Sequence, residues 1–335
     1  MLACIFRGKN DWAIEEVNDL VPDADEVLIK VKVAGLCGTD IHILKGEYFS
    51  SFPLIAGHEF SGEIVEVGKN VLNFRPGDRV TVDPNIPCDR CYFCRINKQI
   101  HCENLRVVGV NQNGAFAEYV VVPQKVVFRL PETLSYQEGA MAEPLACVIY
   151  ALQRVNPKVG SKVLIFGAGP AGLLILACLL IYGAAKVVVV DISKTKLEIA
   201  RDLGAETVLA DGSEIEMLHQ LYPRGFDLVV DATGVPSVME RAFSLVGPDG
   251  SFLIFGVAPK GAKMHIEPYE LFRRDLRIIG SFALNKTMQY SLNLLAEKRI
   301  PVGRFISASF PLRNFDEALR EATENPNHLK IQLYL

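Results

Sequence analysis

The 335-residue sequence has no long uninterrupted hydrophobic run and no excess of positive charge. Its most apolar stretch, residues 163–181, contains three glycines and a proline in its first half, which predicts a strand, a turn and a helix rather than a membrane span. The formal net charge of -4 offers no basic field to phosphodiester backbones, which argues against nucleic acid as the main partner. Strand-like residues 2–6 directly follow Met1, so we expect no targeting signal.

Cysteine is also scarce, with eight residues, and five of them fall in patterns suited to metal rather than to disulfides. A reducing cytoplasm is therefore the expected location. The other three, Cys4, Cys147 and Cys178, have apolar neighbours and are expected to be small core residues. What the chain does contain is 50% hydrophobic and 22% charged residues, the balance of a globular protein, and enough length for two domains.

The character of the sequence changes near residue 150. The first part has short valine-rich stretches broken by Gly, Pro and Asp, such as residues 26–34 and 79–82, and is expected to be mostly β-structure. From residue 162, apolar strands alternate with helical stretches, which indicates βαβ units and a parallel sheet covered by helices. This alternation stops after Ile279. The predicted division is a β-rich domain of residues 1–148 and 283–335 and an α/β domain of residues 149–282.

A glycine-rich segment follows the strand of residues 162–166 and opens an apolar helix, the setting that the G-x-G-x-x-G fingerprint of doubly wound Rossmann domains requires. Gly167 permits the tight turn, Gly169 lets the backbone approach a pyrophosphate, and Gly172 lets helix and strand pack closely. The helix N-terminus adds free N–H groups. The predicted dinucleotide loop is Gly167, Ala168, Gly169, Pro170, Ala171 and Gly172; the alternative is a glycine-rich turn without a ligand.

An aspartate ends the next predicted strand. Asp191 follows Gly172 at the distance where a carboxylate accepts hydrogen bonds from the ribose of NAD and repels the 2′-phosphate of NADP. The sequence therefore favours NAD, although Lys194 and Lys196 stand nearby and would attract a phosphate if they faced it.

Four cysteines with the spacing C-x2-C-x2-C-x7-C lie in a segment that is expected to be a loop. Four thiolates at this density suit a tetrahedral zinc ion. An iron–sulfur cluster needs the same ligands, and disulfides are a further alternative. Since four protein ligands leave no open position, we expect a structural role. The predicted ligands are Cys88, Cys91, Cys94 and Cys102.

Two further clusters carry residues of the metal-ligand type. Catalytic zinc takes about three protein ligands and keeps one position open for water or substrate. Cys37 and His58 supply two of these ligands. The third must be another thiolate or a carboxylate, and the candidates are Glu59, adjacent to His58, and Glu143.

Taken together, these motifs resemble the medium-chain zinc alcohol dehydrogenases over essentially the whole chain. Residues 57–62, Gly-His-Glu-Phe-Ser-Gly, with a further glycine at position 68, look like that family's zinc signature. Residues 37–42, the four-cysteine segment, residues 143–145 and the glycine loop occur in the family's order. The resemblance implies a β-rich, GroES-like catalytic domain split around a Rossmann domain.

The resemblance also implies roles for single residues. Cys37 and His58 would bind the catalytic zinc, with Glu59 or Glu143 completing the shell. Thr39 would be the hydroxyl of the proton relay and His42 its outer base. In the cofactor site, Lys196 would assist Asp191 at the ribose, and Val257 and Ser281 would lie near the nicotinamide, while Asp40 would support the metal site or the fold.

The implied reaction is oxidation of a secondary alcohol or polyol. Zinc would act as a Lewis acid on the substrate oxygen, the proton would leave through Thr39 towards His42, and a hydride would pass to the nicotinamide. Sorbitol dehydrogenases commonly have a tyrosine at the position of Ile43 and an arginine at that of Ala283. Because these two hydrogen-bond donors are absent here, the resemblance favours a less polar diol or a cyclic polyol over sorbitol as the substrate. Relatives are dimers or tetramers, which implies a homo-oligomer.

Other readings of the sequence are an L-threonine-type dehydrogenase, a zinc-free reductase of the same superfamily, and a non-catalytic protein. The reductase would lack the ligand set of Cys37, His58 and Glu143. A non-catalytic protein would be a redox sensor that holds NAD and zinc, or a zinc-knuckle binder of nucleic acid, and the relay residues and the acidic charge balance oppose both.

Overall fold

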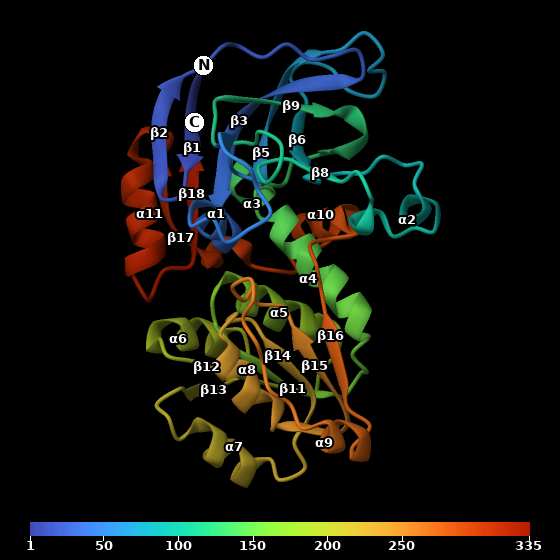
Figure 1. The fold of residues 1–335 in the computed structure, drawn as a ribbon, viewed down its shortest axis with the longest axis vertical. Coiled ribbons are helices and arrows are strands. Elements are labelled where there is room, and N and C mark those ends of the chain that lie inside the picture. The colour runs from blue at the N-terminus through green and yellow to red at the C-terminus, as the bar shows by residue number, and fades with distance from the viewer. The chain divides into compact units, whose positions relative to one another are not determined.

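The computed structural model describes residues 1–335, which form two compact units. Unit 1 consists of Met1–Ala146 and Leu284–Leu335, and unit 2 consists of Cys147–Ala283. In Figure 1 the blue N-terminal and the red C-terminal segments both belong to unit 1. Each unit has its own sheet and its own hydrophobic core.

Unit 1 is built mainly from antiparallel strands. They are β1 (Leu2–Gly8), β2 (Asp11–Glu16), β3 (Glu26–Leu36), β4 (Leu54–Ile55), β5 (Glu59–Val67), β6 (Arg79–Val82), β7 (Asn85–Ile86), β8 (Arg106–Val107), β9 (Tyr119–Pro123), β10 (Val127–Arg129), β17 (Ile306–Pro311) and β18 (Lys330–Tyr334). The largest sheet has the order β10-β6-β5-β3-β18-β17, with β9 also paired to β3. β2-β1-β4 form a second sheet, and β7 pairs with β8.

Helices in unit 1 are short and occupy the connections between strands. They are α1 (Gly38–Leu44), α2 (Tyr92–Arg95), α3 (Tyr136–Gly139), α10 (Met288–Ala296) and α11 (Phe315–Glu324), with single 3₁₀ turns at Gln99–His101, Gln124–Val126, Val302–Phe305 and Leu312–Asn314. α3 starts with a capping box, in which Ser135 and Glu138 each bind the other's backbone N–H. The longer α4 (Ala142–Val155) contains the division between the units.

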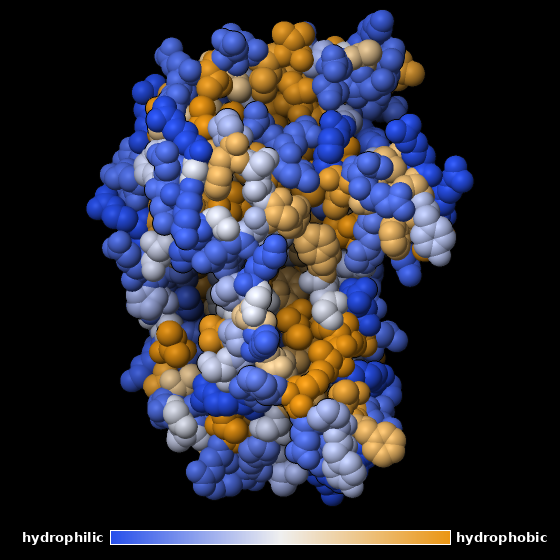
Figure 2. Space-filling model, viewed as in Figure 1, coloured by the Kyte–Doolittle hydropathy of each residue, from blue (hydrophilic) through white to orange (hydrophobic).

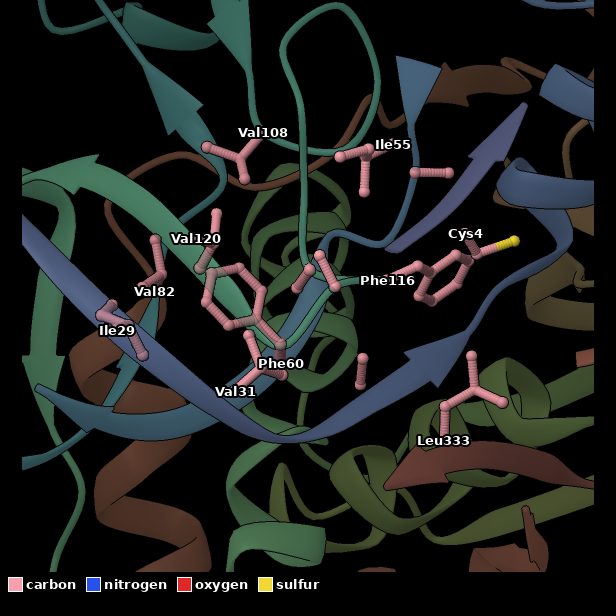
Figure 3. Packing of buried hydrophobic residues seen from close by; sticks show 14 of the residues in the cluster. Cys4, Ile29, Val31, Ile55, Phe60, Val82, Val108, Phe116, Val120 and Leu333 are labelled. Atoms are coloured by element: carbon pink, nitrogen blue, oxygen red, sulfur yellow. The ribbon is translucent and has the colours of Figure 1, made fainter. Parts of the chain in front are cut away.

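The core of unit 1 follows from strand alternation. Val27, Ile29 and Val31 in β3 are fully buried, because every second side chain of the strand points to the same face. Figure 3 shows Ile29 and Val31 beside the ring of Phe60, with the ring of Phe116 nearby. Burial of each such side chain stabilises the fold by about 1.5–3 kcal/mol.

Unit 2 contains a single six-stranded parallel sheet. Its strands are β11 (Lys162–Phe166), β12 (Lys186–Asp191), β13 (Glu206–Leu209), β14 (Phe226–Asp231), β15 (Val246–Ile254) and β16 (Arg277–Gly280), and its further helices are α5 (Pro170–Ile181), α6 (Lys194–Asp202), α7 (Glu214–Leu221), α8 (Pro236–Phe243) and α9 (Pro268–Arg273). The order β13-β12-β11-β14-β15-β16 confirms the predicted doubly wound sheet. The direction of the strand order reverses between β11 and β14, and sheets of this class bind ligands at such a point.

Candidate functional site

The pairing of two strands brings the residues of the first candidate metal site together. β3 and β5 are antiparallel, with Gly35 opposite Glu59, so the end of β3 lies against the start of β5. Cys37 follows β3 as the N-cap of α1, and His58 directly precedes β5. One ligand atom each from Cys37, His58 and Glu59 lies within 4.8 Å of the others. A sulfur, an imidazole nitrogen and a carboxylate oxygen form a donor set that zinc accepts.

Asp40 binds one of these segments and lies close to the other. Its Oδ2 accepts the backbone N–H of Cys37 at 2.8 Å, and its Oδ1 lies 3.4 Å from His58 Nδ1. Neither Oδ1 nor Nδ1 has a hydrogen-bond partner, although both atoms are buried. Burial disfavours the charged ring of His58, but the Asp40 carboxylate and the Cys37 thiol outweigh it and raise the pKa of His58 well above its usual value. The ring therefore sits in a negative environment that attracts a cation.

The sequence did not point to Lys330, which lies in this site. Its Nζ is 2.8 and 2.6 Å from the two carboxylate oxygens of Glu59, and both side chains are buried. The alignment of β18 with β3 places Ile331 opposite Leu36, which brings Lys330 to Cys37. Burial opposes the charge of Lys330, but Glu59, Cys37 and Glu143 together raise the pKa of its ammonium group. A lysine at the start of a strand that is otherwise mostly buried is the signal that could have identified it.

The two candidate carboxylates occupy different places. Glu59 belongs to the group with Cys37 and His58. Glu143 is buried near the start of α4 and acts electrostatically on Lys330. Glu59 is thus the carboxylate grouped with Cys37 and His58, and Glu143 is a second negative charge at the site.

The two predicted relay residues lie on α1. Thr39 and His42 are three positions apart, so they share one face of the helix and Thr39 is the nearer of the two to Cys37. His42 Nδ1 lies 2.9 Å from Oε2 of Glu47, a residue that the sequence analysis did not single out. The next residue, Ile43, is buried in the core of unit 1 and therefore presents no group to a polar substrate.

The four-cysteine segment forms a compact second group. The sulfur atoms of Cys88, Cys91, Cys94 and Cys102 lie within 4.8 Å of one another, and all eight cysteines of the chain are free of disulfides. The backbone N–H groups of Arg90 and Cys91 lower the pKa of Cys88 to about 6. Burial raises that of Cys94 to about 12. Four cysteine sulfurs this close together form a donor set that a tetrahedral zinc ion accepts.

In the glycine loop of unit 2, Gly167 and Gly172 are required by the backbone and its packing, whereas Gly169 leaves room for a ligand. Gly167 has φ of +102°, a conformation that side chains other than glycine rarely adopt. A Cβ on Gly172 would lie 1.9 Å from the carbonyl oxygen of Gly167, so close packing requires glycine there. A Cβ on Gly169 would contact nothing within 4 Å. Gly169 caps α5 and Pro170 begins it, which leaves the space over Gly169 open to a ligand.

Asp191 is tied to this loop. Its Oδ2 accepts the backbone N–H of Ala168 at 2.6 Å and its Oδ1 accepts that of Ser193 at 2.8 Å. Burial lowers the pKa of Lys196, and the charge of Asp191 opposes this shift. Of the residues expected near the nicotinamide, Val257 is 47% exposed, and the buried Oγ of Ser281 has no hydrogen-bond partner.

Two families match most of the chain. Residues 23–132 match the alcohol dehydrogenase GroES-like domain, and residues 170–297 match the zinc-binding dehydrogenases. The chain is 38% identical to D-altritol 5-dehydrogenase of Agrobacterium fabrum, over 98% of this chain and 97% of that protein. It is 34% identical to D-arabinitol dehydrogenase 1 of Uromyces fabae, over 95% and 93%.

Solved structures share the whole fold. A zinc-binding dehydrogenase from Sinorhizobium meliloti 1021 bound to NADP has a TM-score of 0.92 and 34% identity, covering 100% of this chain and 99% of that one. An alcohol dehydrogenase from Escherichia coli CFT073 complexed with NADH has a TM-score of 0.94 and 30% identity, with the same coverage. No helix of this chain combines the length and the apolar character that crossing a membrane requires.

Proposed function

The chain belongs to the family of zinc-dependent medium-chain alcohol and polyol dehydrogenases, and we propose that it oxidises a secondary hydroxyl of a sugar alcohol or a related diol with NAD. The observation that carries this proposal is the group of Cys37, His58 and Glu59, whose ligand atoms lie within 4.8 Å of one another. Unit 1 would be the catalytic domain and unit 2 the dinucleotide-binding domain. Two alternatives, a threonine-type dehydrogenase and a non-catalytic sensor, are not favoured by the relatives, two of which are named for sugar alcohols.

In this proposal Cys37, His58 and Glu59 would hold the catalytic zinc. Bound zinc supplies Lewis acidity, which makes the substrate hydroxyl more acidic. Asp40 lies beside the Nδ1 atom of His58, and Lys330 pairs with Glu59 when no metal is bound. The second zinc belongs to the four-cysteine group, where it holds a loop without a core of its own.

The proton of the substrate hydroxyl leaves along α1. Thr39 accepts it and passes on its own hydroxyl proton, and His42 takes that proton as the outer base. The nicotinamide supplies the hydride acceptor. Val257 and Ser281 would position its ring, and the unpaired Oγ of Ser281 is available to a polar group of the cofactor.

For the cofactor, Asp191 supports NAD over NADP. The N–H groups of Ala168 and Ser193 fix its carboxylate, which would accept the ribose hydroxyls and repel a 2′-phosphate. Lys196 stands beside it and would assist at the ribose. One related structure carries NADP and another carries NADH, so titration with both cofactors tests this preference.

The substrate proposal rests on missing polar groups. Ile43 is buried in the core, and Ala283 offers no donor, so hydroxyls beyond the reacting carbon find fewer partners than in an enzyme with tyrosine and arginine at these positions. This supports a less polar diol or a cyclic polyol over sorbitol.

A homo-oligomer is the proposed assembly, a dimer or a tetramer. β16 is the edge strand of the unit 2 sheet, and Ile278 within it and Phe272 before it are exposed. Figure 2 shows hydrophobic side chains over the part of unit 2 that contains β16. An apolar sheet edge is the kind of surface that a second copy covers. The eight free cysteines support a reducing location such as the cytoplasm.

The test is an activity screen of the purified, zinc-loaded protein. Sugar alcohols, 2,3-butanediol, inositol and L-threonine are each offered with NAD and with NADP, and reduced cofactor is followed by its absorbance before and after removal of zinc by a chelator. We expect oxidation of a polyol or diol with NAD, lost on chelation and restored by zinc. Faster turnover of sorbitol than of every alternative would contradict the substrate proposal, and a complete lack of turnover would contradict the function.

A further inference from the structure

His42 is held at one ring nitrogen by a carboxylate from the turn that follows α1. Glu47 Oε2 lies 2.9 Å from His42 Nδ1, and the Glu47 backbone N–H donates to the His42 carbonyl oxygen at 2.9 Å. Gly46, with φ of +69°, allows the chain to turn back sharply enough for both contacts. The side chain and the backbone of Glu47 therefore both bind His42.

A carboxylate at Nδ1 decides where the proton of a neutral imidazole resides. The ring has one N–H and one bare nitrogen, and the hydrogen bond made by one nitrogen sets the state of the other. Because an ionised carboxylate only accepts hydrogen bonds, the contact places the proton on Nδ1 and leaves Nε2 bare. A bare Nε2 is what His42 needs in order to accept a proton.

The pair also lies at the surface. The side chain of His42 is 23% exposed and that of Glu47 is 39% exposed, so a proton that reaches the ring can pass to water. Lys45 precedes the turn, and Lys9, from the turn between β1 and β2, packs over Gly46. Neither lysine forms an ion pair with Glu47. The carboxylate of Glu47 therefore pairs with His42 alone.

We propose that Glu47 is a positioning residue of the proton relay, which fixes the orientation and the tautomer of His42. This inference rests on the proposed function, in which the substrate proton travels through the Thr39 hydroxyl to His42. Nε2 then gains that proton while Nδ1 keeps its own, and Glu47 stabilises the resulting imidazolium. The imidazolium returns one proton to water, so the relay ends unchanged and no oxidation of the protein occurs.

The first test needs no turnover. Nitrogen NMR of the six histidine rings, with His42 assigned by a His42→Ala variant, reports which nitrogen carries the proton at a pH where the ring is neutral. We expect the Nδ1–H form in the natural protein and a shift towards Nε2–H in Glu47→Ala. An Nε2–H ring in the natural protein would overturn the proposal.

The second test uses kinetics. Glu47→Gln keeps an oxygen for the Nδ1–H but removes the charge, so the acidic limb of the kcat profile should move down by about one pH unit. Glu47→Ala should lower kcat about tenfold and increase its solvent deuterium isotope effect, with KM for the alcohol and Kd for the cofactor unchanged. Glu66→Gln, an exposed acid on β5, is the matched control.

The outcomes separate this inference from the proposed function. If His42→Ala loses kcat while both Glu47 variants keep the natural profile and isotope effect, the relay stands and the role of Glu47 is wrong. If the natural enzyme does not oxidise alcohols at all, the proposed function is wrong and the kinetic test does not apply. The tautomer measurement then still decides whether Glu47 sets the protonation state of the His42 ring.

Discussion

Lys330 binds both carboxylate oxygens of Glu59, at 2.8 and 2.6 Å, inside the group of candidate zinc ligands. The two residues are 5% and 1% exposed. Removal of one partner from a buried ion pair leaves an uncompensated charge, which costs about 3–5 kcal/mol. Lys330 and a zinc ion would therefore compete for the same carboxylate, and the metal would be able to replace the lysine as its partner.

Lys330→Met should destabilise the metal-free protein by about 3 kcal/mol, because Glu59 is left buried and unpaired. The loss should shrink when zinc is loaded, since Glu59 can then pair with the metal. Urea unfolding of the variant with and without zinc measures both values, and Lys69→Met, at an exposed position, is the control. The same destabilisation in both states would mean that the pair has no connection with the metal.

Gly169→Ala and Gly172→Ala should have opposite consequences. A Cβ on Gly169 meets no atom of the protein, so this variant should fold normally and bind NAD at least about tenfold more weakly, because the methyl group occupies the place of the pyrophosphate. A Cβ on Gly172 would collide with the Gly167 carbonyl and should cost about 2 kcal/mol or more. Thermal unfolding and cofactor titration distinguish them. Normal NAD affinity in Gly169→Ala would place the pyrophosphate elsewhere.

Cys94→Ser should remove one metal ion per chain and make the four-cysteine segment sensitive to proteases, because that segment is held by its metal rather than by a core. Metal analysis by mass spectrometry and limited proteolysis provide the readouts. Cys178→Ser changes a buried cysteine of α5 and should leave the metal content unaltered. Visible absorbance typical of an iron–sulfur cluster in the natural protein would contradict the assignment of zinc.

Asp83 should make stability depend on pH. Burial raises its pKa to about 6, although the backbone and side-chain N–H groups of Asn85 partly oppose this by donating to Oδ1. Since the folded-state pKa is above the unfolded one, the stabilising contribution is complete below about pH 4 and is lost as the pH rises through about 6. Asp83→Asn keeps an acceptor without the charge, so its stability relative to the natural protein should rise by about 2–3 kcal/mol between acid and neutral pH. Urea midpoints that differ equally at about pH 4 and about pH 7.5 would contradict this.

Local patterns were sufficient to predict the fold. The glycine loop lies within a few residues of the strand and helix that it joins, and the alternation of strands and helices after residue 162 directly reports the parallel sheet. Cys37, His58 and Glu59 could be identified as ligand candidates from their neighbours in sequence. The strand pairing that brings Glu59 to Cys37 is not visible in the sequence.

Partners that are distant in sequence could not be predicted. Lys330 is 271 residues from Glu59, and in the sequence it is only the lysine that begins a short strand. Glu47 is close to His42 in sequence, but an exposed glutamate after a helix is common and carries no signal of its own. The sequence identifies Ile43 as a residue without a polar group, and its burial together with Leu44 in the core of unit 1 follows from tertiary packing that local patterns do not report.

The central claim is that Cys37, His58 and Glu59 share an accessible zinc ion. Anomalous scattering from crystals of the metal-loaded protein, measured on both sides of the zinc absorption edge, tests this directly. We predict a peak at about 2.3 Å from Cys37 Sγ and about 2.0–2.1 Å from a His58 ring nitrogen, and a second peak within the four-cysteine group. A peak in the four-cysteine group alone, with none between Cys37 and His58, would contradict the proposed catalysis.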